Sequence, residues 1–229
     1  MKELFGHIQI QVNEKVYLKD PNSSDLGKRI LGEGLLLIDE VGLERFTFRK
    51  LAKRLETTES SIYRYFENKH KLLIYFISWY WGWLEYQLVF STANLSSAEE
   101  KLRIAIRILA ANVRETDAPG PINVEVLNRL VVSESSKAYL TKEVDEANKE
   151  GFYLGYKRLV GRVADFVSEI NADYPYPHTL ISTIAEGIQH QKYFADHLPS
   201  LTDIQQDAGL LATCYTDMAL STVTQYSPK

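Results

Sequence analysis

The stretch Thr57–Leu73, TTESSIYRYFENKHKLL, determines how the rest of this chain is interpreted. A capping hydroxyl opens a short run in which Ile62 and Phe66 lie four residues apart, the spacing of one helix face. A polar pair then separates this run from a long apolar one. The pattern predicts a short helix over residues 58–66 and a long helix over residues 69–92.

Two further helices are expected upstream. Ser24 or Asp25 caps the first, which ends at Gly42 because glycine readily adopts the conformation that closes a helix. Thr47 caps the second, over residues 48–55. The outward positions of this second helix are all basic: Arg49, Lys50, Lys53 and Arg54. A basic helix followed by a short one predicts a helix-turn-helix whose last helix enters a DNA major groove.

The charge distribution supports this interpretation. The whole chain of 229 residues carries a net charge of −4, with 45% hydrophobic and 24% charged residues, as in an ordinary globular protein. Residues 45–71 hold eight Lys or Arg against three Glu, whereas residues 72–229 hold thirteen against nineteen Asp or Glu. A basic block joined to an acidic remainder indicates that only the block meets phosphate, although basic residues also serve simply to solvate a helix.

The residues of this block carry a resemblance to a known family. The segment TFRKLAKRLETTESSIYRYFENKHKLL resembles the DNA-binding domain of the tetracycline-repressor (TetR) family. The shared features are a Thr before the second helix, an apolar-Ala pair within it, a Tyr-x-Tyr-Phe run and an Asn-Lys pair. In this chain they are Thr47, Leu51-Ala52, Tyr63-Arg64-Tyr65-Phe66 and Asn68-Lys69.

The resemblance covers residues 26–76 and implies an all-α protein. A helix-turn-helix domain is expected over residues 25–71, and a helical ligand-binding and dimerisation domain over residues 72–229. The resemblance further implies a repressor that binds a palindromic operator as a homodimer, joined through its last two helices and released by a small-molecule effector.

Individual DNA contacts follow from both lines of reasoning. Helix-turn-helix proteins place N-terminal residues of the second helix at base edges, which predicts contacts from Ser60, Ser61 and Arg64. Arg64 has the fork geometry that recognises guanine O6 and N7. The resemblance adds backbone or groove contacts, at Thr47, Tyr63, Tyr65 and Lys69.

The turn between the second and third helices departs from the family pattern. Glu56 stands where glycine is usual, and Thr57 stands where a hydrophobic residue is usual. The turn requires a positive φ, which costs a residue with a side chain about 1 kcal/mol or more. Either the turn geometry differs in this chain, or the domain tolerates the strain. The same feature favours the competing interpretation, a helical ligand-binding or scaffold dimer whose DNA-binding domain is vestigial.

The N-terminal extension, residues 1–24, has a pattern of its own. Ile8, Ile10 and Val12 alternate with Gln, and Val16 and Leu18 alternate after a polar pair. Alternation of period two predicts a short β-ribbon, or else an extended arm. Such a segment could follow a DNA backbone, clasp a partner subunit or cover an apolar patch.

The remainder of the chain reads as helices around an aromatic cluster. The long helix over residues 69–92 holds all three tryptophans, which serve either as core or as the wall of an aromatic effector site; the candidate effector-binding residues are Trp79, Trp83 and Tyr86. Further helices are expected over residues 96–113, 124–132, 136–170, 178–197 and 202–226, with Gly151, Gly155 and Gly161 as possible bends in the third of these.

Other kinds of function have little support. His190 and His197 lack the Cys or carboxylate partners of a metal site, and Cys214 has no nearby His to activate it. We therefore expect no metal, no cofactor and no enzymatic activity. Glu85 and Gln87 interrupt the one candidate membrane span. A single cysteine and the lack of a signal-peptide pattern favour a cytoplasmic protein.

Overall fold

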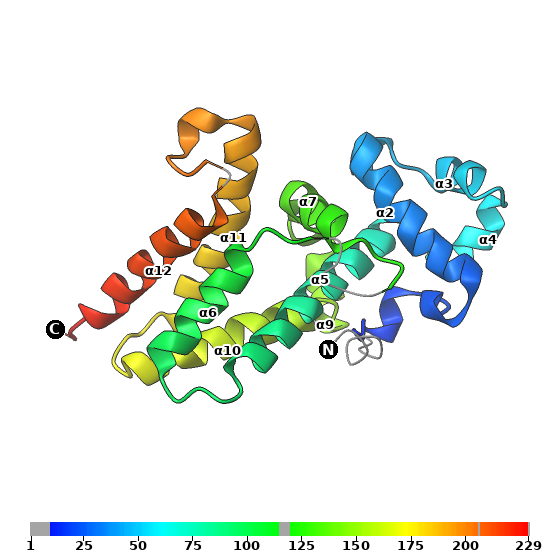
Figure 1. Ribbon diagram of the computed structural model, residues 1–229. Coiled ribbons are helices and arrows are strands. Elements are labelled where there is room, and N and C mark those ends of the chain that lie inside the picture. The colour runs from blue at the N-terminus through cyan, green and yellow to red at the C-terminus, as the bar shows by residue number, and fades with distance from the viewer. Residues whose placement is uncertain (1–9, 115–119, 206, 229) are drawn as a thin grey trace. The chain divides into compact units, whose positions relative to one another are not determined.

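The computed structural model describes residues 10–114, 120–205 and 207–228, and these residues form helices and no strand (Figure 1). Two compact units are present. Unit 1 consists of the residues up to Gly82 together with Val113–Leu154, and unit 2 of Trp83–Asn112 together with Gly155–Lys229. This division differs from the expected domains 25–71 and 72–229, because residues 113–154 pack with the N-terminal part of the chain.

The described part of the N-terminal extension, residues 10–24, forms no β-ribbon. Residues 10–24 contain two 3₁₀ turns, η1 (Glu14–Val16) and η2 (Pro21–Ser23). Instead of forming a hairpin turn, Asn13 caps η1, and its side-chain amide donates to the Glu150 carbonyl at 2.8 Å. Val12 and Val16 are both buried, so the described part of this arm covers apolar surface in unit 1. Ile8 lies outside the described residues.

Unit 1 contains the three helices that the sequence predicts for the helix-turn-helix domain. The first of them is α2 (Asp25–Arg45). Ser24 caps α2 by accepting from the Gly27 amide, and Gly42 bends its last turn with φ of 75°. Helices α3 (Phe48–Arg54) and α4 (Glu59–Tyr63) follow, and α5 (Lys69–Thr92) begins at the predicted residue. Phe46, Leu51, Ile62 and Phe66 are fully buried and form the core of this helical cluster.

Three short helices complete unit 1. They are α7 (Val124–Glu134), α8 (Ser136–Tyr139) and α9 (Val144–Lys149), and α7 packs against α2. The single helix expected over residues 136–170 is therefore wrong. Gly151 is one physical reason, since its φ of 82° is a conformation that breaks an α-helix. Gly155 and Gly161 lie inside the helix that follows.

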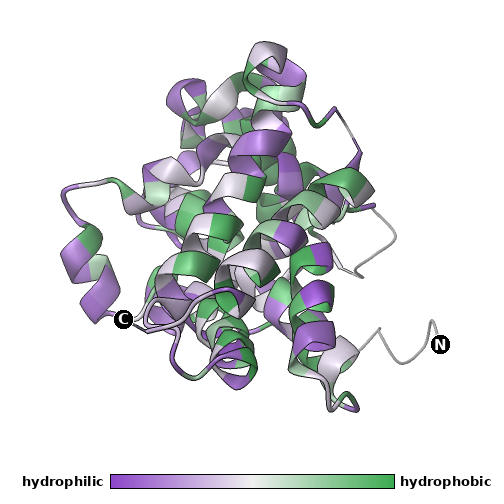
Figure 2. Ribbon diagram, turned by 90° about the vertical axis from the view of Figure 1, so that its left-hand side faces the viewer, coloured by the Kyte–Doolittle hydropathy of each residue, from purple (hydrophilic) through white to green (hydrophobic). Residues whose placement is uncertain are grey.

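Unit 2 contains the end of α5 and four longer elements. These are α6 (Ala98–Ala110), α10 (Leu154–Ile170), α11 (Pro177–His197) and α12 (Ala208–Thr224), with the 3₁₀ turn η4 (Pro199–Leu201) before α12. Helix α12 packs mainly on α6 and also contacts α11. Helices α6 and α10 are amphipathic, with apolar residues buried on one face of each. Figure 2 shows the hydropathy of each residue along the helices of the chain.

Candidate nucleic-acid interface

The turn between α3 and α4 has the geometry predicted for it. The Glu56 amide donates to the Lys53 carbonyl at 3.3 Å, and the Thr57 amide donates to the Ala52 carbonyl at 2.9 Å. These two bonds define a Schellman motif, which requires a left-handed residue between them. Glu56 is that residue, with φ of 53°, and among the described residues it alone has a positive φ without being glycine. Of the two alternatives, the turn keeps its left-handed geometry, and Glu56 adopts it in place of glycine.

Hydroxyl groups cluster at the start of α4. Thr58 caps the helix, since its side chain accepts from the Ser61 amide at 3.3 Å. The Thr58 hydroxyl also shares hydrogen bonds with the hydroxyls of Ser60, at 2.8 Å, and Ser61, at 2.9 Å. Ser60 is exposed and Ser61 is half-buried. A helix N-terminus with exposed short donors can approach the edges of bases or a phosphate.

Tyr63 and Arg64 extend this surface at the other end of α4. Both are exposed, and Tyr63 rests its ring edge-on against Phe48, with 5.0 Å between ring centroids. Ile62 beside them is fully buried, so the helix presents one apolar and one polar face. The long side chain of Arg64 can therefore reach outward from a helix whose orientation is fixed by its packing.

Tyr65 and Lys69 occupy different positions from the residues above. Tyr65 is buried, and its hydroxyl shares a hydrogen bond of 2.7 Å with Ser24. The Lys69 ammonium donates to the carbonyls of Leu43 at 2.8 Å and Glu44 at 3.1 Å. It also approaches the Phe46 carbonyl, at 3.5 Å. Both side chains thus hold the segments around the helix-turn-helix in place.

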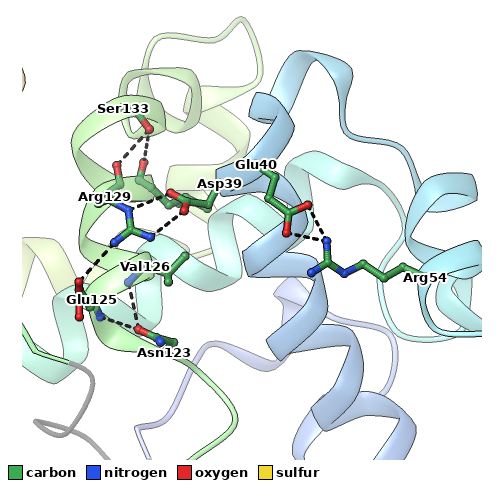
Figure 3. Close-up of polar contacts among 9 residues, drawn as sticks. Asp39, Glu40, Arg54, Asn123, Glu125, Val126, Arg129 and Ser133 are labelled. Carbon is green, nitrogen blue, oxygen red and sulfur yellow. Dashed lines mark hydrogen bonds and ion pairs between the residues drawn. The ribbon is translucent and has the colours of Figure 1, made fainter. Parts of the chain in front are cut away.

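The basic face of α3 separates into two kinds of residue. Arg54 is bound to two carboxylates of α2, Glu33 at 2.6 Å and Glu40 at 2.7 Å, and Figure 3 shows the pair with Glu40. Arg49 and Lys53 are exposed and make no ion pair within the described part of the chain. Positive charge available to a phosphate is therefore concentrated on these two residues.

Thr47 links this face to the loop before it. Its hydroxyl accepts from the Lys50 amide at 3.2 Å and caps α3, while the residue itself remains exposed. The Lys50 ammonium turns back to the Arg45 carbonyl, at 2.7 Å. Thr47 is consequently positioned, with its hydroxyl and amide, at the N-terminus of α3, where a backbone phosphate is favoured.

Helix α7 holds the end of α2 through contacts that sequence reasoning missed. Arg129 forms a two-pronged ion pair with Asp39, with distances of 2.7 and 3.3 Å (Figure 3). Glu134 is buried, and its carboxylate accepts from the Leu43 amide at 3.1 Å. These partners are about 90 residues apart along the chain, so no local pattern could have indicated them.

The aromatic residues of α5 have mixed surroundings. Trp79 is half-buried and Trp83 is buried, while Tyr86 stacks on exposed Phe90 with 6.4 Å between ring centroids. Nearby Trp81 donates its indole N–H to the Tyr139 hydroxyl at 2.6 Å, which is a contact within the core of unit 1. The role of Trp79, Trp83 and Tyr86 in effector binding stays a prediction.

The described residues contain no group of three or more His, Cys, Asp or Glu side chains that could hold a metal ion. His190 instead stacks on Phe194, and His197 lies against Tyr193. Over the same residues, no helix has both the length and the apolar character needed to cross a membrane.

Sequence comparison assigns the helix-turn-helix to a family. Residues 30–76 match the model of bacterial regulatory proteins of the tetR family. The chain is also 43% identical, over 44 residues, to the tetracycline repressor protein class G of Vibrio anguillarum. That match spans 19% of this chain and 21% of the repressor, so it concerns only a short segment of either protein.

Structural comparison extends the likeness to the whole fold. A crystal structure of AibR in complex with isovaleryl coenzyme A and operator DNA has a TM-score of 0.58 and 15% identity, covering 87% of this chain and 97% of AibR. The fatty acid degradation regulator FadR from Bacillus halodurans has a TM-score of 0.58 and 17% identity, covering 84% of this chain and 93% of FadR. The superantigen PfiT has a TM-score of 0.57 and 16% identity, covering 89% of this chain and 97% of PfiT. The chain therefore carries a tetR-family helix-turn-helix segment on an all-α fold that regulators and a superantigen share.

Proposed function

We propose that this protein is a ligand-responsive transcriptional regulator, a repressor, that binds a palindromic operator as a homodimer. The observation that carries the proposal is the surface formed by α3 and α4. The exposed Ser60, the half-buried Ser61, the guanidinium of Arg64 and the cations of α3 lie on a helix-turn-helix segment that matches the model of tetR-family bacterial regulators. The fold by itself would not suffice, because the superantigen PfiT has a similar one.

Within this proposal, α4 enters the major groove and reads bases, while its surroundings contact phosphates. Arg64 provides base recognition and Ser60, Ser61, Tyr63 and Thr47 provide shorter contacts. The buried position of Tyr65 and the carbonyl partners of Lys69 support a positioning role for these two residues, which act on DNA through the placement of α3 and α4.

A homodimer through α11 and α12 is the second part of the proposal. Leu210 and Met218 of α12 are about half exposed, and Leu198 and Leu201 beside η4 are exposed as well. Apolar side chains gathered at the end of the chain are what an interface between copies would cover. Two helix-turn-helix segments would then meet successive major grooves, with half-sites about 34–36 Å apart or somewhat more.

An effector would act by binding the DNA-bound and free arrangements with different affinity, since a ligand shifts an equilibrium only through such a difference. Trp79, Trp83 and Tyr86 are the proposed contacts. AibR supports the idea that a protein with this fold can be crystallised with both a coenzyme A thioester and an operator.

The test of the DNA-binding proposal compares two arginines. Operator fragments are first selected from genomic DNA, and binding is then measured for the wild type, Arg64→Ala and Arg49→Ala. Arg64→Ala should lose about 1–3 kcal/mol of discrimination at one base pair. Arg49→Ala, the matched control on α3, should weaken all sequences equally and reduce the salt slope by about one unit.

Two outcomes would contradict the proposal. An equal loss on every sequence for Arg64→Ala would remove it from base recognition. Failure to enrich any palindrome, together with a stable dimer, would favour the alternative of a helical ligand-binding or scaffold dimer. The strained turn at Glu56 is the observation that keeps this alternative open.

A further inference from the structure

A groove of about 520 Å³ lies between α6 and α12, entirely within unit 2 and outside the helix-turn-helix. Its polar lining consists of Arg103, Arg107, Thr213, Thr216 and Asp217, together with the side chain of Asn112. Small residues of both helices, alanines and a glycine, make up the remainder and leave the space between the helices open. A groove of this size can hold a small organic molecule.

The two arginines face this groove without a carboxylate partner. Arg103 and Arg107 are exposed, are four residues apart on one face of α6, and form no ion pair with Asp217 or any other described carboxylate. Helix α10 offers an internal comparison, because its arginines at the same spacing, 158 and 162, both bind the buried carboxylate of Glu85 at 2.9 and 3.0 Å. The α6 pair therefore has the arrangement of an anion clamp whose anion must come from outside the chain.

Thr216 gives a second, independent observation. It is 6% exposed, lines the groove, and its hydroxyl makes no hydrogen bond with the described residues. The neighbouring threonines of α12 behave differently: Thr213, Thr222 and Thr224 each donate to the carbonyl four residues earlier, at 2.9, 2.7 and 2.7 Å. The Thr216 hydroxyl is therefore left available as a donor to a molecule in the groove.

The end of α6 favours an anion as well. The Lys192 ammonium donates to the carbonyls of Leu109 and Ala111, both at 3.1 Å, and Ala111 lines the groove. These carbonyls belong to the helix C-terminus, which would otherwise present partial negative charge. Lys192 offsets that charge, so the field in the groove is dominated by the two arginines, with Asp217 as the one opposing side chain in the lining.

The groove borders the apolar face proposed for dimerisation. At about 100° per residue, Thr216 lies about 160° around α12 from Cys214, which sits between Leu210 and Met218 on the outer face. Asp217 lies only about 20° around the helix from Leu210, so the groove and the outer face share an edge. A partner subunit on the outer face would leave Thr216 turned toward α6 and would lie beside Asp217.

We propose that this groove binds an organic phosphate of roughly nucleotide size. The phosphate bridges the guanidinium groups of Arg103 and Arg107, the Thr216 hydroxyl bonds to it or to the adjoining ester oxygen, and Asp217 accepts from a hydroxyl or amino group at the far end of the ligand. A phosphate offers three oxygens to the two guanidinium forks, whereas the α10 pair at the same spacing shares the two oxygens of one carboxylate. The volume also exceeds what an inorganic phosphate would fill.

The experiment uses the full chain and a small panel of probes in isothermal titration calorimetry. The organic phosphates are AMP and glucose 6-phosphate, adenosine and glucose are the matched phosphate-free compounds, and citrate and inorganic phosphate are the other anions. At least one organic phosphate should bind more tightly than its phosphate-free partner and than either simple anion.

Variants then connect binding to the groove. The double change Arg103→Ala/Arg107→Ala should weaken the organic phosphate about 30-fold or more, because it removes two charge-assisted contacts. Thr216→Val, which keeps the shape, should weaken it about 3- to 10-fold. The matched control Lys142→Ala/Lys149→Ala removes the same charge from exposed positions in unit 1 and should leave affinity unchanged. Circular dichroism and the thermal midpoint check that each variant is folded.

Several results would overturn the proposal. These are no binding by either organic phosphate, equal binding of the phosphate-free partners, or undiminished binding by the folded double-arginine variant. Conversion of that variant to a monomer, with no bound phosphate in the wild type, would identify the arginines as an interface instead. Arg64→Ala protein should bind the phosphate normally, so failure here and failure of the DNA-binding proposal are distinguishable.

Discussion

Replacing Glu56 by glycine should stabilise the protein, although it removes a side chain and adds no contact. Glu56 is held at φ of 53° by two backbone hydrogen bonds of the turn. The left-handed conformation costs a residue with a Cβ roughly 1–2 kcal/mol. Glycine avoids that cost but loses roughly 0.5–1 kcal/mol more backbone entropy on folding. The difference predicts a gain of about 0.5–1 kcal/mol in the free energy of unfolding.

The assay is urea unfolding at fixed protein concentration, followed by circular dichroism, with the thermal midpoint as a second measurement. For a chain of this length, such a gain corresponds to a rise of about 1–4 °C. Glu56→Ala is the matched control, because it removes the same carboxylate while keeping the Cβ in the left-handed region. Its free energy of unfolding should stay within about 0.5 kcal/mol of the wild type.

The two variants also separate strain from charge in DNA binding. Each removes one negative charge beside α4, so both should raise affinity for any DNA sequence by a similar factor that shrinks with added salt. Equal stabilisation by Glu56→Ala and Glu56→Gly would show that charge, and not the backbone conformation, is responsible. A loss of stability in Glu56→Gly would refute the reasoning from φ altogether.

Two further predictions concern lysines whose ammonium groups donate to backbone carbonyls. Lys69→Met should lower the free energy of unfolding by about 1–3 kcal/mol, since it leaves carbonyls of the loop before α3 unpaired, and should leave the salt slope of DNA binding unchanged. Lys53→Met, the exposed control on α3, should leave the free energy of unfolding nearly unchanged and should reduce the salt slope by about 0.9 in titrations at several salt concentrations. A reduced slope for Lys69→Met would place Lys69 at a phosphate. Burial lowers the pKa of Lys192 to about 8, so on raising the pH the folded state loses this proton before the unfolded state does. The free energy of unfolding of the wild type, relative to that of Lys192→Met, should therefore rise by about 2 kcal/mol between pH 8 and pH 10. Urea unfolding of both proteins at four pH values measures this difference, and a constant difference would contradict the depressed pKa.

The helix-turn-helix could be predicted because its determinants are local. Ser24, Thr47 and Thr58 each cap a helix by accepting from the amide three residues later. Capping, helix-face spacing and the left-handed turn all depend on residues within about five positions of one another. The start of α5 was predicted for the same reason.

The errors arose where a short pattern fits more than one structure. Alternating apolar residues near Val12 and Val16 suit a strand, but they equally suit an arm that wraps around a 3₁₀ turn. Residues 136–170 keep one helical phase, yet Gly151 and the bonds of its neighbours interrupt them. Apolar spacing records which side chains face inward, and it does not record where the backbone between them turns.

The side-chain partners of the site were out of reach for a different reason. Arg54 looks like one of four equivalent cations in the sequence, and only the folded chain brings Glu33 and Glu40 to it. Tyr65 and Lys69 match family positions that suggest DNA contact. In the structure, however, the Tyr65 hydroxyl bonds to the Ser24 hydroxyl, and the Lys69 ammonium donates to carbonyls of the loop before α3. A motif identifies which residues matter, and long-range contacts decide what each one does.

The loop between α2 and α3 shows why this distinction matters for function. Glu134 of α7 accepts from the Leu43 amide, while the Lys69 ammonium donates to the Leu43 carbonyl, so one peptide segment is held from both sides. The same loop leads directly to Thr47 and the start of α3. Because Glu134 is buried and Lys137 pairs with it at 2.8 Å, removing Lys137 would leave the Glu134 carboxylate uncompensated in the interior. The placement of the proposed DNA-contacting helices therefore depends on residues that touch no DNA and lie as far as 90 positions away in the sequence.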